Sequence, residues 1–255
     1  RSDGDDSRAV GLSRRKGKLF ADLGVGANVA GAAQLVSNQD LSNRGVCLFG
    51  SGFIVTEAEA ESLGLGRTPG IENVIRKYRN GRDLTQRPRG VRVIDLYGLS
   101  VEEVRDQYPA IYQWVLERVK PERDQNKRES RRKNWWLFGE TNPKLRQQLA
   151  ELDRYVTTVE TAKHRVFQFL DGDVLPDNKL LNIAIDDATY LGILSTRIHV
   201  VWGMSAGSWL GVGNDSVYAK TRCFETFPFP EINEAQAGVV TQLTERLDNH
   251  RKTQL

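Results

Sequence analysis

Short runs of β-branched and aromatic residues, bounded by polar turns, predict strands in two parts of the chain. In the first half these runs cover residues 18–23, 46–55, 74–78 and 91–96, the second of them interrupted by two glycines. In the second half they cover residues 154–160, 164–170 and 179–185. Strands in both halves, with helical patterns between and after them, predict a mixed sheet in an α+β fold.

Capping signals mark the starts of two helices. Thr56 followed by Glu59, and Ser100 followed by Glu103, are capping boxes, in which the two side chains satisfy backbone donors at a helix start. The second box opens a helical region that extends over about residues 100–150. We expect this region to be an insertion into the strand pattern.

Apolar and basic residues share a four-residue spacing within that insertion. Ile111, Val115 and Val119 recur every four residues, which predicts one buried helix face. Pro121 should break or restart the helix, because proline lacks the backbone donor that a helix interior needs. Basic residues then continue at the same spacing along one side, at Arg123, Lys127 and Arg131.

Residues 187–202 form the most apolar long segment and predict one buried helix. The positions expected on its buried face are Leu191, Leu194, Ile198 and Val201. His199 lies within this segment, far in sequence from His164 and His250, so a hydrogen-bonded histidine in the core is expected there rather than a metal ligand.

The C-terminal residues 234–255 predict a surface helix with an inward apolar face. The inward positions by spacing are Val240, Leu243 and Leu247. A turn region at residues 207–213 and the prolines Pro228 and Pro230 separate this helix from the preceding segment. The expected fold is therefore α+β, with a mixed sheet, a helical basic insertion and a C-terminal helix.

The order of these elements predicts three parts. Residues 1–16 are polar and charged and should form a flexible segment, residues 17–213 should form the main domain, and residues 214–255 should form a C-terminal segment. Five Trp, nine Phe and seven Tyr supply enough aromatic surface for a packed core. The chain begins at Arg1 and has a single methionine, Met204, so we expect it to be a piece of a longer protein.

Positive charge is concentrated in two segments. Residues 118–138 carry eight basic and three acidic residues, a net +5, and residues 76–92 carry seven basic residues and one acidic residue, a net +6. The whole chain has a net charge of only +3, so the rest of it carries −8. Two cationic zones on an acidic body indicate a polyanionic partner, and nucleic acid is the first to consider.

Cysteine usage and hydropathy bear on the compartment. Cys47 and Cys223 lie far apart and the sequence has no CxxC pair, so a disulfide framework or a zinc ribbon is not indicated and a reducing cytoplasm is expected. No apolar run approaches the length that crosses a membrane, so we expect no membrane partner.

Short matches to catalytic and cofactor motifs lack the surroundings that they need. Gly50 and Gly52 resemble a cofactor-binding turn, but the residues after them continue as strand and do not open a helix. Asp177 and Lys179 have the spacing of half a nuclease site, whereas residues 175–178 read as a turn. We therefore expect no catalytic, cofactor-binding or metal-binding residues in this chain.

The basic segments are better candidates for function, because arginine presents a two-pronged donor to guanine and phosphate and lysine a point charge to phosphate. Residues 79–89 resemble a recognition loop, with Arg79, Asn80, Arg82, Gln86, Arg87 and Arg89 as candidate base readers. The candidate phosphate contacts are Arg123, Lys127, Arg128, Arg131, Arg132, Lys133, Lys163 and Arg165. The alternative for each segment is a solvated charged surface.

Five short strings occur in an order that resembles a known family. They are NGRDL at 80–84, NWWLFG at 134–139, LPDN at 175–178, LGILS at 191–195 followed by His199 and Trp202, and TRCFETFPFP at 221–230. Together they are similar to the C-terminal part of MmeI-like class I DNA methyltransferases, over roughly residues 18–230. Members of that family are bacterial restriction–modification or phage-defence enzymes that use S-adenosylmethionine to methylate adenine N6.

The resemblance implies which part of such an enzyme this chain is. The matching region is the target recognition domain with a C-terminal segment, and Trp135 and Trp136 become structural landmarks within it. The catalytic Asn-Pro-Pro-aromatic motif of the family has no counterpart here, because Lys144 and Leu145 follow Asn142 and Pro143. We therefore expect no cofactor in this chain, and S-adenosylmethionine to be bound by the parent enzyme.

The hypothesis that follows is a fragment that binds double-stranded DNA and positions it for methylation by the parent's catalytic domain. Two alternatives remain open. One is a metal-dependent nuclease that uses Asp177 and Lys179. The other is a protein-interaction module that docks on the parent's catalytic domain through Trp135, Trp136 and the C-terminal helix.

Overall fold

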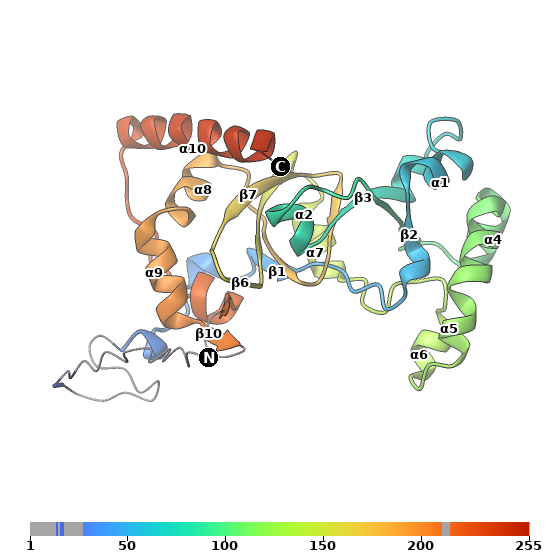
Figure 1. Ribbon diagram of the computed structural model, residues 1–255, viewed down its shortest axis with the longest axis horizontal. Helices are drawn as coiled ribbons and strands as arrows, with labels where there is room; N and C mark the ends of the chain where they lie inside the picture. Colours follow the sequence, from blue (N-terminus) through green and yellow to red (C-terminus); the bar gives the residue numbers. More distant parts are fainter. Residues whose placement is uncertain (1–13, 15, 18–27, 211–214, 255) are drawn as a thin grey trace, which may run out of the picture.

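The computed structural model describes residues 28–210 and 215–254, together with Arg14, Lys16 and Gly17. Most of the expected flexible segment 1–16, the strand expected at 18–23 and part of the turn region at 207–213 lie outside these residues. The described chain forms an elongated molecule of two lobes that meet at a waist (Figure 1). Its mixed α+β architecture and its C-terminal helix confirm the predicted fold class.

The first lobe is built on a four-stranded sheet in the order β2-β4-β3-β8. Its strands are β2 (Ile54–Val55), β4 (Arg92–Ile94), β3 (Ile75–Arg79) and β8 (Val174–Pro176). The β3–β8 pair is parallel and the other two pairs are antiparallel. Because β8 comes from the second half of the chain, this sheet joins the two halves in sequence.

Helices surround this first sheet. They are α1 (Glu57–Ser62), α2 (Gly81–Thr85), α3 (Val101–Gln107), α4 (Pro109–Arg118), α5 (Lys120–Asp124), α6 (Glu129–Lys133) and α7 (Pro143–Leu149). Single helical turns at Ser51–Phe53 and Ile71–Asn73 join some of them to the strands. One apolar core, including Phe53, Ile94 and Trp135, packs α1, α3 and α4 on the sheet. Leu84 of α2 and Leu149 of α7 pack instead with Tyr155 and Leu170 of the second lobe.

The second lobe is built on an antiparallel sheet in the order β1-β9-β5-β7. Its strands are β1 (Ser42–Arg44), β9 (Leu180–Ile183), β5 (Arg154–Val159) and β7 (Phe167–Asp171). A small sheet beside it contains β10 (Ser208–Leu210), β11 (Asp215–Val217) and β6 (Thr161–Ala162). The helices α8 (Ala188–Leu194), α9 (Arg197–Ala206) and α10 (Glu234–Gln254) cover this lobe (Figure 1), and shorter turns lie at Val29–Gly31, Val36–Asn38 and Lys220–Phe224.

The helix signals in the first half are confirmed. Both capping boxes form, with Thr56 and Ser100 accepting a hydrogen bond from the backbone of the glutamate three residues later. Ile111, Val115 and Val119 are all buried. The helix ends at Arg118 and restarts at Lys120, one residue before Pro121, as expected of a proline in a first turn.

Two predicted elements differ from the structure. The strand expected at 46–55 forms only at its end, as β2 (Ile54–Val55). Before β2, Val46 and Cys47 make isolated bridges, Phe49 adopts a left-handed φ of 48° and Ser51–Phe53 forms a helical turn. The single helix expected at 187–202 is two helices, since the Thr196 side chain caps the backbone of His199 and starts α9 afresh. That break turns Ile198 and Val201 outward, and they are 76% and 52% exposed.

The inward face of α10 is more polar than predicted. Of the three apolar positions expected there, Val240 is half-buried against α8, whereas Leu243 and Leu247 are exposed. Leu243 is 56% exposed, whereas Thr244 and Asp248 are buried. The reason is the open edge of β7, whose backbone needs partners: Oδ1 of Asp248 accepts a hydrogen bond from the amide of Phe169 at 3.0 Å, and Arg251 donates to the carbonyl of Phe167 at 2.7 Å. The helix therefore covers a strand edge with polar groups.

Candidate nucleic-acid interface

The string NGRDL at 80–84 forms the short helix α2 at the waist of the molecule. Oδ1 of Asn80 accepts hydrogen bonds from the amides of Arg82 and Asp83, at 3.0 and 3.3 Å, and the Asp83 carboxylate accepts one from the amide of Asn80 at 2.8 Å. This reciprocal cap starts a helix directly after β3. It leaves the Arg82 side chain exposed to solvent.

A cavity of about 890 Å³ lies beside α2. Its walls come from five separate segments: α2, the stretch from the end of β5 through β6 into β7, the turn between β8 and β9, the start of β11, and the last turns of α10. Apolar side chains line part of it, including Val159 and Val166. The basic side chains that border it are Arg82, Lys163, His164, Lys179, His250 and Arg251.

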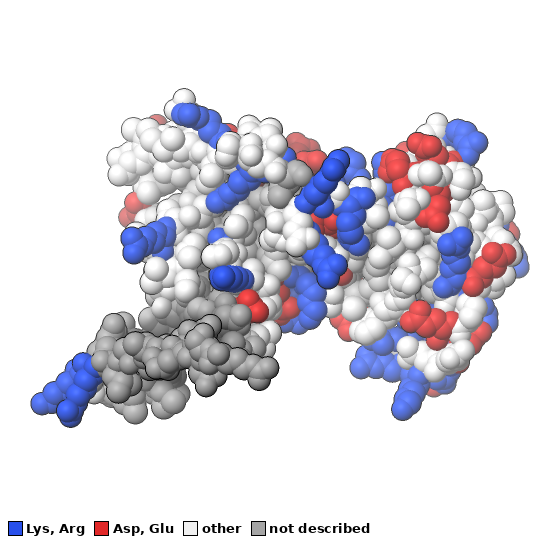
Figure 2. All heavy atoms as spheres, viewed as in Figure 1, with Lys and Arg blue, Asp and Glu red and all other residues white. Residues whose placement is uncertain are grey.

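Cationic side chains converge on this cavity although they lie far apart in the sequence. Only Asp177 and Asp215 are acidic among its lining residues. In Figure 2, Lys and Arg side chains gather over the middle of the molecule, where α2 lies, and again at the end formed by α5 and α6. A cavity with an apolar wall and a basic rim suits the sugar–phosphate backbone of a nucleic acid.

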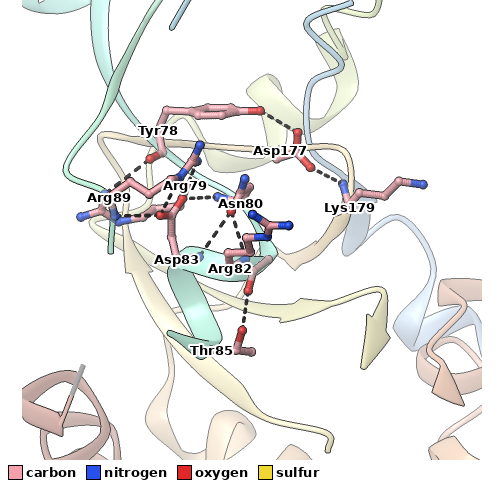
Figure 3. A network of polar contacts seen from close by, with 10 residues as sticks. Tyr78, Arg79, Asn80, Arg82, Asp83, Thr85, Arg89, Asp177 and Lys179 are labelled. Atoms are coloured by element: carbon pink, nitrogen blue, oxygen red, sulfur yellow. Dashed lines mark hydrogen bonds and ion pairs between the residues drawn. The ribbon is translucent and has the colours of Figure 1, made fainter. Parts of the chain in front are cut away.

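Asp177 serves the fold of this region (Figure 3). Its Oδ2 accepts a hydrogen bond from the hydroxyl of Tyr78 at 2.6 Å, and its Oδ1 accepts one from the amide of Lys179 at 2.9 Å. Burial, followed by the nearby Asp177 carboxylate, raises the pKa of Tyr78, so the phenol stays a donor. Both oxygens of Asp177 thus hold the turn between β8 and β9.

The described residues give no support to the nuclease alternative. They contain no group of three or more His, Cys, Asp or Glu side chains placed to share a metal ion. Nor does the Gly50–Gly52 turn form a cofactor-binding unit, because it leads through a helical turn into β2 and not from a parallel strand into a long helix.

Two of the arginines expected to contact phosphate are occupied inside the protein. Arg123 is 1% exposed, and its Nη2 donates to the carbonyls of Leu48 and Leu137 at 2.8 and 3.0 Å. Arg165 donates to the carbonyl of Ser216 at 2.9 Å and also to that of Val159. Burial lowers the pKa of both guanidinium groups. Arg123 is thus enclosed in the core, and the half-buried Arg165 has its donors engaged within the fold.

The rest of the second basic segment remains at the surface. Lys127, Arg128, Arg132 and Lys133 are exposed around α6, and the only ion pair that the described residues give them is the one between Lys133 and Glu129, at 2.9 Å. Arg131 is half-buried and stacks on the ring of Phe49, with 3.6 Å between its guanidinium carbon and the ring centroid. This end of the molecule can present cations to a phosphate backbone.

The residues of the predicted recognition loop differ in their exposure and in their contacts. Gln86 and Arg87 are exposed, and Asn80 and Arg79 are half-buried. Arg89 is bound to the buried carboxylate of Asp83, to which it donates from Nε at 3.0 Å and from Nη2 at 2.7 Å. Their roles as base readers stay a prediction.

Sequence reasoning did not assign His164, Lys179, His250 or Arg251 to the interface. Lys179 lies in the stretch with the spacing of half a nuclease site, His164 lies between the candidates Lys163 and Arg165, and His250 and Arg251 lie outside the two basic segments. They reach the cavity through the sheet pairing of β5, β7 and β9 and through the packing of α10 on β7. Apart from the position of His164 next to Lys163, no local signal in the sequence predicts that convergence.

The tryptophan pair is structural, as the sequence predicted. Trp135 is 8% exposed within the first core, and Nε1 of Trp136 donates to the carbonyl of Leu99 at 2.9 Å. His199 is buried and its Nε2 lies 2.7 Å from the hydroxyl of Tyr218, which confirms the hydrogen-bonded core histidine. Within the described ranges, no helix is long and apolar enough to cross a bilayer.

Comparison with known proteins gives this arrangement a family. The family described as "MmeI, target recognition domain" matches residues 35–231. A solved structure of the Type IIL restriction–modification enzyme MmeI in complex with DNA is similar in fold, with a TM-score of 0.70 and 18% sequence identity. The match covers 91% of this chain and 30% of that one, so the chain spans about a third of the enzyme's length. No curated protein matches. Since the family match covers most of its length, this chain belongs to the MmeI target recognition domains.

Proposed function

We propose that this chain binds double-stranded DNA and reads a short target sequence in it. The observation that carries the proposal is the convergence of Arg82, Lys163 and Lys179, from three separate segments, on one cavity at the waist. Family membership supports it, and the similar enzyme was solved in complex with DNA. Phosphate contacts from Arg82, Lys163 and Lys179 would fix the duplex, and the neighbouring loop after α2 would approach the base edges.

The reaction that this binding serves belongs to a longer protein. We propose a parent restriction–modification enzyme of the phage-defence type, in which a separate catalytic domain methylates an adenine that is turned out of the duplex. S-adenosylmethionine would be the methyl donor in that domain. The catalytic domain would also be this chain's protein partner, and the bacterial cytoplasm, where the DNA lies, its compartment.

A DNA-binding measurement on this chain tests the proposal. The affinity for a duplex should fall steeply with salt, because each phosphate contact releases about one counterion. Charge reversal at two cavity residues, Arg82→Glu with Lys163→Glu, should lower the magnitude of the salt slope by about 2. The measurement is fluorescence anisotropy of a labelled duplex across a salt series.

The matched control reverses two exposed arginines outside both basic segments, Arg105→Glu with Arg197→Glu. Its net charge change equals that of the cavity variant, so a general electrostatic effect would appear in both. An equal loss in the two variants would contradict the assignment of the cavity, and no salt-dependent binding by the unaltered chain would contradict DNA binding itself.

A further inference from the structure

Residues 80–89 form a loop that one buried carboxylate closes at its base. The side chain of Asp83 is fully buried. It accepts four hydrogen bonds: from the amide of Asn80 at 2.8 Å, and from the amide, Nε and Nη2 of Arg89 at 2.9, 3.0 and 2.7 Å (Figure 3). Asp83 therefore ties the residue before α2 to the residue that ends the following loop.

The open end of this loop carries two polar side chains. Gln86 and Arg87 are exposed, and among the residues that the structure describes neither side chain makes a hydrogen bond within the protein. The amide of Gln86 donates to the carbonyl of Arg82 at 2.8 Å, which fixes where the loop leaves α2. Gly90 has a left-handed φ of 65° and turns the chain into β4. The loop that carries both exposed side chains is thus fixed where it leaves α2 and where it enters β4.

We call the pair of Asp83 and Arg89 the clamp. Both side chains of the clamp stay charged in the folded protein. Burial alone would raise the pKa of Asp83, but the hydrogen bonds from Arg89 and from the amide of Asn80 outweigh burial and hold this pKa below its usual range. The same carboxylate raises the pKa of Arg89. A carboxylate that accepts a two-pronged pair of bonds from one arginine fixes direction as well as distance, which lysine cannot do.

We propose that Asp83 and Arg89 are positioning residues for base reading, and that Gln86 and Arg87 are the side chains they place against the bases. This inference rests on the proposed function, and it gives Arg89 a role other than direct contact with DNA. Glutamine and arginine suit adenine and guanine edges respectively, and each pairing depends on a fixed geometry. Loss of the clamp should therefore reduce sequence preference far more than affinity for DNA in general.

The deciding variant is Arg89→Lys, which keeps the positive charge and removes the fork. The full chain is first allowed to select sequences from a pool of duplexes with a randomised stretch. Affinities are then measured for the selected duplex and for the unselected pool. The control is Arg92→Lys, since Arg92 makes a similar two-pronged pair with Glu57, at 2.7 and 2.8 Å, away from the loop.

We expect Arg89→Lys to bind the unselected pool within about twofold of the unaltered chain and to lose about tenfold in preference for the selected duplex. Arg92→Lys should keep both. A preference that survives in Arg89→Lys, or an equal loss for selected and unselected DNA, would overturn the clamp. If the unaltered chain bound the pool but selected no sequence, base reading would be overturned while phosphate binding stood. If it bound no DNA, the proposed function itself would fail.

A second measurement does not depend on DNA. Amide hydrogen exchange at Asn80 should become faster in Asp83→Asn and in Arg89→Lys than in the unaltered chain, because the acceptor of that amide loses its anchor. Unchanged exchange in Arg89→Lys, with the fold intact by circular dichroism, would also overturn the clamp.

Discussion

His199 is an imidazole enclosed by aromatic rings in the second lobe. It is fully buried, its ring meets that of Phe227 edge to face at 4.3 Å, and its Nε2 faces the hydroxyl of Tyr218. Burial, with a smaller contribution from Arg165, lowers the pKa of His199 to about 3. The folded protein therefore keeps this residue neutral well below pH 6.5.

That shift predicts how stability depends on pH. Between about pH 6.5 and pH 3 the unfolded chain binds a proton at residue 199 that the folded chain does not. The contribution of His199 to stability is complete above pH 6.5 and is lost as the pH falls, by at most about 1.4 kcal/mol per pH unit. Urea unfolding of His199→Gln between pH 7 and pH 5 should show a shallower pH dependence than the unaltered chain. Equal slopes in the two proteins would contradict this account.

Individual arginines also show what residue type can and cannot predict. The sequence located the basic segments 76–92 and 118–138, and most of their side chains are at the surface. It could not show that Arg89 and Arg123 are occupied within the protein, because their partners are Asp83 and two backbone carbonyls brought close by folding. Charge is encoded locally, whereas the availability of a donor is decided by the tertiary structure.

At the scale of elements, the sequence predicted where helices begin more reliably than which face of a helix is buried. A capping box acts within four residues, so Thr56 and Ser100 predicted their helices correctly. The buried face of α10 depends on what lies beneath it. The free edge of β7 and the small Gly192 of α8 select the side that carries Thr244 and Asp248, although hydropathy alone favours the opposite choice.

The α8–α10 contact gives a prediction about stability. A Cβ added at Gly192 would lie 2.6 Å from Cγ1 of Val240 and still closer to Oγ1 of Thr244. Gly192→Ala should therefore force the helices apart and lower the free energy of unfolding by about 1–3 kcal/mol. Gly238 lies in α10 with nothing within 4 Å of the same position, so Gly238→Ala should raise stability by about 0.5–1 kcal/mol. Thermal unfolding measures both, and a stabilised Gly192→Ala would disprove the close contact.

At the scale of the whole molecule, the parallel pair of β3 and β8 connects the lobes. Lys77, Tyr78 and Arg79 of β3 face Val174, Leu175 and Pro176 of β8, and Tyr78 also reaches Asp177 beyond β8. The sequence predicted neither this pairing nor the cavity beside it, because strands about a hundred residues apart carry no mark of their partner. The two basic segments of the sequence indicated a nucleic-acid partner. The residues that line the cavity are brought together only by folding.

This connection predicts cooperative unfolding. If β8 is needed by both lobes, amides in the two sheets should open together, with equal free energies of opening. Native-state hydrogen exchange at Val93 of β4 and Val156 of β5, followed in increasing urea, provides the measurement. Opening of one strand at a clearly lower free energy than the other would show that the lobes unfold independently.

The pairing of β8 with β3, which come from the two halves of the chain, also limits where recombination between related genes can occur without harm to the fold. A crossover between β4 and β8 would join β3 from one parent to β8 from another. The paired residues Tyr78 and Leu175 would then come from two proteins in which they had not evolved together. Crossovers before β2 or after β9 keep the pair together. Specificity should therefore pass between relatives as one inherited block that includes both the α2 loop and the turn after β8.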